Sequence, residues 1–280
     1  MNLSHVAKVR PRSEVVMRFI YPLARRLIQR LAVYGINPLF IVLSHGALGL
    51  LAAALIAIGG GLAFVLAALL LQLKTLLDNI DGGLARATGQ VTEMGRYLDT
   101  VVDFIVNIAL LAALSNYGSN VLSLLAFVWL TIILSLDFNA EHLYKSRRQE
   151  AAQSQRAPQE PPGAPLWLLE LFRGIYALLF APQDRWLREL DMRYLEQLSG
   201  QPRDQLDADT LLHWNDLFST ATLVNLGLST QMLILGVLLL LGWPFAYVGA
   251  LWLMAVYVVA VQWWRGERFK RYLTEREAKA

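Results

Sequence analysis

This sequence has no cysteine among its 280 residues, so the protein can form no disulfide framework and carries no thiol for redox chemistry. That composition is compatible with a site facing the cytoplasm. Charged residues are also scarce, at 17% of the chain, and they nearly cancel to a net charge of +3. The first residues lack the short apolar core and the small-residue cleavage site of a signal peptide. The distribution of charge is therefore more informative than its sum, and we expect no nucleic-acid partner.

Hydrophobic residues make up 56% of the chain, and the mean hydropathy is +0.42. Several apolar runs approach the roughly 20 residues that an α-helix needs to cross a bilayer. The sequence therefore predicts an all-α, polytopic membrane protein with six transmembrane helices. These helices are expected at residues 37–58, 62–80, 96–114, 121–136, 217–241 and 245–263.

The segments outside these runs are polar or basic. Apolar side chains recur at helical spacing over residues 15–31, which predicts an amphipathic helix lying on the membrane surface. A soluble helix packed on a partner protein is the alternative. An interfacial helix is expected at residues 166–180, and an amphipathic cytosolic helix at 184–198. The chain thus divides into a basic membrane-surface segment (1–35), transmembrane helices one to four (36–138), a cytosolic helical insertion (139–216), transmembrane helices five and six (217–264) and a basic cytosolic tail (265–280).

Positive charge predicts the orientation in the membrane. The three turns expected outside, residues 59–61, 116–120 and 242–244, contain no Lys or Arg. Apart from Lys74, the basic residues lie on the other side or at its boundary, so both termini should be cytosolic, in the cell (inner) membrane. No internal repeat supports an inverted-repeat transporter.

Four acids occur at the junction of the second and third apolar runs. Asp78 and Asp81 share one helical face, and so do Asp99 and Asp103. If the two helices are antiparallel neighbours, the four carboxylates converge. Each intramembrane charge costs roughly 2.5–3.5 kcal/mol, so a cation is expected among them. Carboxylate ligands favour Mg²⁺, Mn²⁺ or Ca²⁺. The alternative is that each Asp only caps a helix or extends toward water, which is the ordinary role of a single Asp at the end of a membrane helix.

The residues between the acids indicate what such a metal would serve. Gly82 and Gly83 remove side chains beside Asp81, so a ligand could approach the backbone, and Arg86 supplies a planar charged fork for phosphate oxygens. A divalent metal, an arginine and a glycine-lined approach together predict a diphosphate site.

The spacing D-x2-D-G-x2-A-R-x8-G-x3-D-x3-D, from Asp78 to Asp103, resembles the signature of the CDP-alcohol phosphatidyltransferase family at all eight fixed positions. The resemblance implies a divalent-metal-dependent transferase of phospholipid biosynthesis that takes a CDP-linked donor and releases CMP. The expected reaction moves a phosphatidyl group from CDP-diacylglycerol to a polar alcohol. Transfer from a CDP-amino alcohol to diacylglycerol is an alternative, as are a membrane metal-binding or transport protein and an inactive scaffold.

The resemblance also implies roles for individual residues, two bound ions of Mg²⁺ or Mn²⁺, and a homodimer. Asp78 and Asp99 would bridge both ions, Asp81 would bind one, and Asp103 would bind the other and act as the general base. The CDP moiety would be held by Gly82, Ala85, Arg86, Thr92 and Gly95. A helix N-cap is the alternative for Thr92.

The first apolar run departs from the family pattern. Leu39 and Val42 stand where the family has Asn and Thr, and Ser44 or His45 could compensate. Hydrogen-bonded packing is the alternative for His45. Lys74, one turn before Asp78, could pair with an acid or with a ligand phosphate, or could snorkel to water.

The acceptor site is the least defined part of the pattern. The basic group Lys145, Arg147 and Arg148 could bind an acceptor phosphate or anionic lipid headgroups. Polar residues in the fifth span could line an acceptor cavity or form interhelical hydrogen bonds. These residues are Asn225, Ser229, Thr230 and Gln231.

Overall fold

The computed structural model describes residues 15–147 and 165–278, and every regular element in these two ranges is a helix. The all-α prediction is confirmed. The helices are α1 (Val15–Val33), α2 (Pro38–Ile58), α3 (Gly61–Thr88), α4 (Glu93–Ser115), α5 (Asn120–Arg147), α7 (Leu166–Leu179), α8 (Ala181–Ser199), the 3₁₀ turn η2 (Arg203–Gln205), α9 (Ala208–Trp214), α10 (Leu217–Val224), α11 (Leu228–Leu240) and α12 (Ala246–Glu277).

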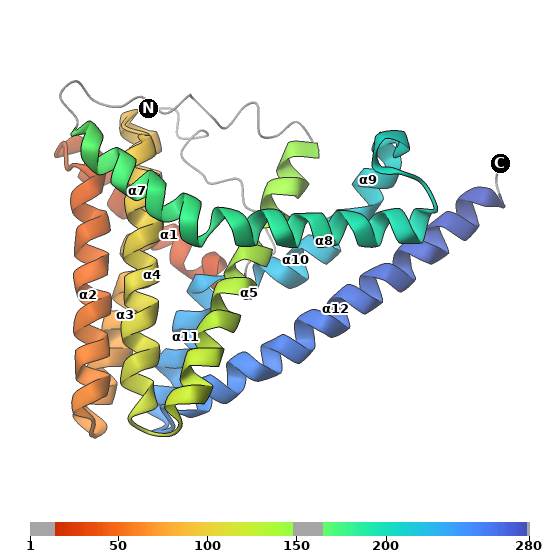
Figure 1. The fold of residues 1–280 in the computed structure, drawn as a ribbon. Coiled ribbons are helices and arrows are strands. Elements are labelled where there is room, and N and C mark those ends of the chain that lie inside the picture. The colour runs from red at the N-terminus through yellow and green to blue at the C-terminus, as the bar shows by residue number, and fades with distance from the viewer. Residues whose placement is uncertain (1–14, 148–164, 279–280) are drawn as a thin grey trace.

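Within the described residues, six stretches are long and apolar enough to cross a membrane, which confirms the expected number for an integral, multi-pass protein. They are Pro38–Ile58, Gly61–Thr88, Glu93–Ser115, Asn120–Tyr144, Ala208–Leu240 and Ala246–Glu277. The α2–α3, α4–α5 and α11–α12 turns lie together at one end of the bundle, and α7 and α8 cross the bundle away from that end (Figure 1).

Close helix packing holds α2 against α4. A Cβ atom at Gly46 would lie 2.5 Å from Cγ1 of Val102, and one at Gly49 would lie 2.6 Å from Cγ1 of Val106. Small residues of this kind let two membrane helices approach closely. Because α2 also packs along α3, the residue next to Gly46, His45, is carried to the region between α3 and α4.

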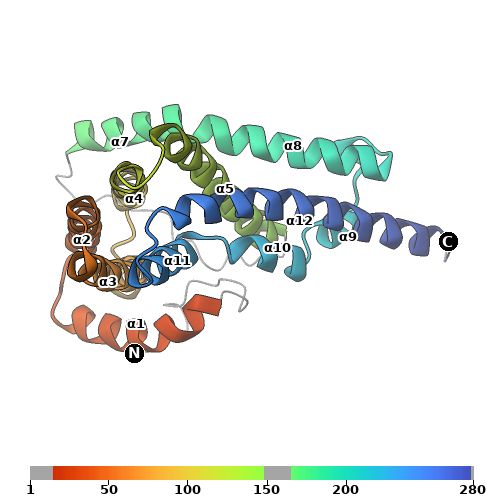
Figure 2. The same ribbon diagram turned by 90° about the horizontal axis from the view of Figure 1, so that it is seen from below.

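The second span is longer than expected. Its helix was expected to end near residue 80, but α3 continues to Thr88 and ends at Gly89, whose φ of 71° is the left-handed conformation that glycine adopts readily. Arg86 is therefore a helical residue instead of part of the connection between the second and third spans. The amphipathic segment at residues 15–31 is helical too, and it packs on α3 through Ala24 and Ile28 (Figure 2).

The fifth span is broken, which corrects the single helix expected over residues 217–241. The chain leaves helical geometry at residues 225–227, between α10 and α11. The side-chain amide of Gln231 donates to the freed carbonyl of Leu226 at 2.9 Å, and the Tyr247 hydroxyl donates to Gln231 at 3.0 Å. Interhelical hydrogen bonding, one of the two interpretations of the polar residues here, thus holds for Gln231.

Hydrogen bonds at the start of α8 join it to α7 within the 139–216 insertion and to α5 of the bundle. The Tyr176 hydroxyl donates to Asp184 at 3.1 Å, and Gln183 donates to Ser135 of α5 at 2.9 Å. Burial, with the carboxylate of Asp184 nearby, raises the pKa of Tyr176 to about 12, so this phenol stays a donor at neutral pH. The helices expected at 166–180 and 184–198 are present as α7 and α8.

Candidate metal and nucleotide site

Three helices bring the candidate site together. Asp78 and Asp81 project from α3, Asp99 and Asp103 from α4, and His45 from α2. Helix α2 packs along both α3 and α4, whereas α3 and α4 have few contacts with each other. The side chains of the acids therefore meet between α3 and α4, beside α2, although the two helix backbones are not closely packed on each other.

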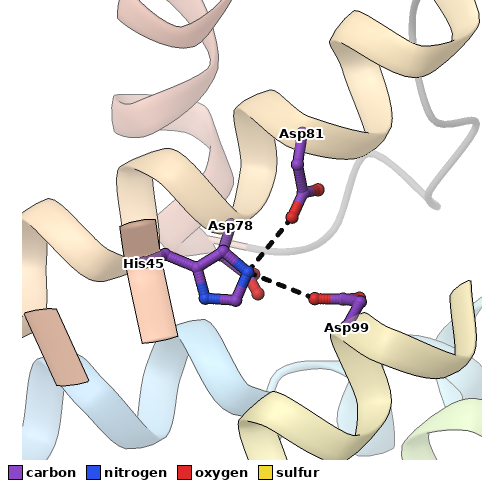
Figure 3. A group of neighbouring side chains, drawn as sticks. All are labelled: His45, Asp78, Asp81 and Asp99. Atoms are coloured by element: carbon purple, nitrogen blue, oxygen red, sulfur yellow. Dashed lines mark ion pairs between the residues drawn. The ribbon is translucent and has the colours of Figure 1, made fainter. Parts of the chain in front are cut away.

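His45 joins the aspartates. Its Nε2 atom lies 3.2 Å from Oδ2 of Asp81 and 3.3 Å from Oδ1 of Asp99, and the whole residue is 0% exposed (Figure 3). One candidate ligand atom from each of His45, Asp78, Asp81 and Asp99 lies within 4.8 Å of the others. The sequence signal for His45 was only the departure of the first span from the family pattern.

This cluster fits a divalent ion. Both ring nitrogens of His45, Oδ2 of Asp81 and Oδ1 of Asp99 are buried and have no hydrogen-bond partner within the described ranges. Nε2 lies at ion-pair distance from both oxygens, but buried polar atoms are nearly always hydrogen-bonded in native proteins, so this group of atoms suits a shared cation. An ion with bonds of about 2.1 Å holds opposite ligands roughly 4.2 Å apart, close to the spacing here. Carboxylate oxygens suit Mg²⁺ and Mn²⁺, and a ring nitrogen favours the softer of the two.

Asp103 has a different partner. The Lys74 ammonium lies 2.6 Å from Oδ1 of Asp103 and 4.0 Å from Oδ1 of Asp78, and Lys74 is 1% exposed. Lys74 therefore pairs with acids, and the snorkelling interpretation is wrong. The four expected carboxylates are consequently divided: three lie with His45, and the fourth is bound by a lysine.

Two of the motif glycines make room for neighbouring polar groups. A Cβ atom at Gly82 would lie 3.3 Å from Nη1 of Arg86, and one at Gly95 would lie 3.0 Å from Oγ1 of Thr92. Thr92 is the N-cap of α4, and its hydroxyl accepts a hydrogen bond from the Gly95 amide at 2.9 Å. The N-cap interpretation of Thr92 is thus confirmed.

Gly83 serves packing in this structure. A Cβ atom there would overlap Cδ1 of Ile28, so this glycine allows α1 to lie against α3. The expectation that both glycines open the backbone to a ligand is therefore wrong for Gly83. Its neighbour Gly82 stays available for that role because it is only partly buried.

The expected acceptor group remains a prediction. Arg148 lies outside the described residues, and Lys145 and Arg147 belong to the last turn of α5, where only the backbone is described. A contact that the sequence did not indicate covers the start of α4 instead. Arg173 of α7 donates to Glu93 at 2.7 Å, and the rings of Tyr97 and Tyr176 lie 5.3 Å apart.

Comparison with known proteins agrees with the motif. The family model for CDP-alcohol phosphatidyltransferases matches residues 36–184, just over half of the chain. A bifunctional IPC transferase and DIPP synthase of Aquifex aeolicus is 42% identical over 52 residues, which is 19% of this chain and 12% of that protein. An archaetidylinositol phosphate synthase of Pyrococcus horikoshii is 37% identical over 54 residues, 19% of this chain and 29% of that protein. The matched stretch spans less than a third of either relative.

Proposed function

Because this chain belongs to the CDP-alcohol phosphatidyltransferase family, we propose that it transfers a phosphatidyl group from CDP-diacylglycerol to a hydroxyl of a polar alcohol and releases CMP. One observation carries the proposal above all. A buried His45–aspartate cluster whose ligand atoms form no hydrogen bonds within the described residues lies in the matched region, and two of its aspartates share helix α3 with Arg86. Such a cluster binds a divalent ion, and the arginine next to it suits a diphosphate.

The metal is Mg²⁺ or Mn²⁺. Asp78, Asp81 and Asp99 hold it together with His45, and the family resemblance implies a second ion, at Asp103. When bound, divalent ions neutralise the diphosphate and the charge that develops on the leaving CMP. The CDP moiety lies against α3 and the start of α4. Its contacts are Gly82, Ala85, Arg86, Thr92 and Gly95.

The transfer is a substitution at phosphorus. The hydroxyl oxygen of the acceptor forms a bond to the phosphorus that carries diacylglycerol, and the bond from this phosphorus to the bridging oxygen breaks. The bridging oxygen leaves with its electron pair as part of CMP. The hydroxyl proton passes to Asp103, whose Oδ1 is held by Lys74 and whose second oxygen can accept it.

The site faces the cytosol, and both termini lie on that side of the inner membrane. The three turns that lack Lys and Arg lie together at one end of the bundle, while Asp78 and Asp81 lie toward the other end of α3 (Figure 1). The donor keeps its acyl chains in the bilayer, with α1 at the membrane surface. The acceptor reaches the site near Lys145, Arg147 and Arg148, and the protein acts as a homodimer.

The test is CMP release by the purified protein in lipid nanodiscs. CDP-diacylglycerol is supplied with Mn²⁺ or Mg²⁺ and a panel of polyols, amino alcohols and their phosphates, inositol phosphate included. Acceptor-dependent CMP release that Asp81→Asn abolishes is expected. Asp207→Asn is the matched control, because Asp207 is a surface aspartate paired with Arg276 and should leave the rate unchanged. No CMP with any acceptor, together with metal flux in liposomes, would support a transport protein instead.

A further inference from the structure

Lys74 is an unusual residue for a membrane-spanning helix. A lysine there normally extends its long side chain toward water, because a charge is costly inside the bilayer. Lys74 is instead one of the largest fully buried side chains described, at 1% exposure. It lies one turn before Asp78 on α3, so the two side chains share a face. The lysine is therefore directed into the site between α3 and α4.

The ammonium group of Lys74 lies between carboxylates, where a metal ion could otherwise bind. It contacts Oδ1 of Asp103 at 2.6 Å and lies 4.0 Å from Oδ1 of Asp78, so it links an acid of α4 with an acid of α3. An ammonium has three donors and no acceptor, so it satisfies carboxylate oxygens as a metal ion does. A divalent ion bound to Asp103 would have to displace this bond or lie beside a like charge in a poorly solvated place.

The two halves of the site differ sharply. On the His45 side, Nε2 lies at ion-pair distance from one oxygen each of Asp81 and Asp99, but within the described residues none of these buried atoms forms a hydrogen bond. On the Asp103 side, the carboxylate accepts a 2.6 Å hydrogen bond from the Lys74 ammonium. Asp103 is also absent from the group whose ligand atoms lie within 4.8 Å of one another, a group that has His45 as its fourth member. The residues present thus fit one ion well and a second ion poorly.

We propose that this chain binds a single divalent ion, held by His45, Asp78, Asp81 and Asp99, and that Lys74 occupies the place of the second ion at Asp103. The inference rests on the proposed function, because it concerns the same metal site. It departs from the two ions that the family resemblance implies. Lys74 is then a positioning residue: its ammonium binds Oδ1 of Asp103 and so orients the other carboxylate oxygen toward the acceptor hydroxyl.

The number of bound ions tests this directly, without any turnover. The wild-type protein in nanodiscs is titrated with Mn²⁺, the bound metal is counted per chain, and its electron paramagnetic resonance spectrum is recorded. We expect one Mn²⁺ per chain with the hyperfine pattern of an isolated ion. In Lys74→Met, which keeps the length of the side chain and removes its charge, we expect two Mn²⁺ per chain and the spectrum of an exchange-coupled pair.

Two further variants serve as controls. Lys270→Met removes an exposed lysine of α12 that pairs with Glu267, and it should bind one ion as the wild type does. Lys74→Met combined with Asp103→Asn leaves no buried charge at the second position, and it should also bind one ion. The wild-type count alone can overturn the proposal even if Lys74→Met does not fold, because two coupled ions there would exclude a lysine at the second position.

The outcomes separate this inference from the proposed function. Two coupled ions in the wild type would overturn the role of Lys74 and leave the proposed transferase intact. A single ion in a folded Lys74→Met variant would also overturn it, because something other than the lysine would then exclude the second ion. No bound Mn²⁺ in the wild type would overturn both the single-ion centre and the metal-dependent function.

Discussion

Replacing Arg265 by methionine should strongly destabilise the protein. Arg265 of α12 is 6% exposed and donates to Asp191 of α8 at 2.5 Å, to Asn215 at 2.8 Å and to the carbonyl of Trp214 at 2.9 Å. Its guanidinium also lies 3.8 Å from the centre of the Trp214 ring. A single side chain thus joins α12 to α8 and to the end of α9.

The expected magnitude follows from what the substitution leaves behind. Asp191 stays largely buried, with 14% of its side chain exposed, and it loses its charged partner. Removing one member of a buried ion pair typically costs about 3–5 kcal/mol. At about 2–4 °C per kcal/mol for a chain of roughly this size, the unfolding midpoint should fall by roughly 10 °C.

Thermal unfolding in nanodiscs, followed by tryptophan fluorescence at one fixed scan rate, measures this shift. Arg268→Met is the matched control, because Arg268 lies on the same helix and its ion pair with Asp216 is more exposed, so its midpoint should move little. Adding Asp191→Asn to Arg265→Met should restore part of the loss by removing the unpaired charge. Equal shifts for the Arg265 and Arg268 variants would refute the reasoning.

Three further variants test the site. Asp103→Asn should abolish CMP release yet keep the thermal stabilisation by CDP, and surviving activity would show that Asp103 is not the base. Gly82→Ala should weaken CDP binding measured by calorimetry, because the added Cβ would lie 3.3 Å from Arg86. Gly83→Ala should mainly lower the unfolding midpoint, because its added Cβ would overlap Ile28. The reverse pattern would contradict these assignments. His45→Asn should lower the affinity of the site for Mn²⁺ by at least 10-fold, a loss of the order seen when metal-supporting groups are removed. It should also reduce the preference of the site for Mn²⁺ over Mg²⁺, because the ring nitrogen is lost. Unchanged affinities would exclude His45 as a ligand.

Hydrophobic runs and the spacing of the acids were enough to predict the helical class, the six spans and the acids of the site. Helix ends were harder. The second span was expected to end near residue 80, where its apolar run gives way to Asp81 and two glycines, residues of low helix propensity. Packing of α1 through Ile28 overrides that local preference, and α3 continues to Thr88. The break at residues 225–227 coincides with Asn225 and Gly227, but hydropathy over the whole span concealed it, and Gln231 with Tyr247 stabilises it in the fold.

The partners within the site were not predictable from spacing either. A lone histidine in an apolar span does not indicate what it faces, and the close approach of α2 to α4 is what places His45 at Asp99. Lys74 could have paired with an acid of its own helix, as helical spacing suggests. Its shorter contact is with Asp103 of α4, which only the relative position of the helices determines.

The most direct test of the metal-dependent transferase is a structure of the protein with CDP and Mn²⁺, with the metal located by its anomalous scattering. We predict an anomalous peak between His45, Asp81 and Asp99, with the diphosphate of CDP between that peak and Arg86. A nucleotide bound instead near Lys145 and the end of α5, with no metal among the aspartates, would contradict the account.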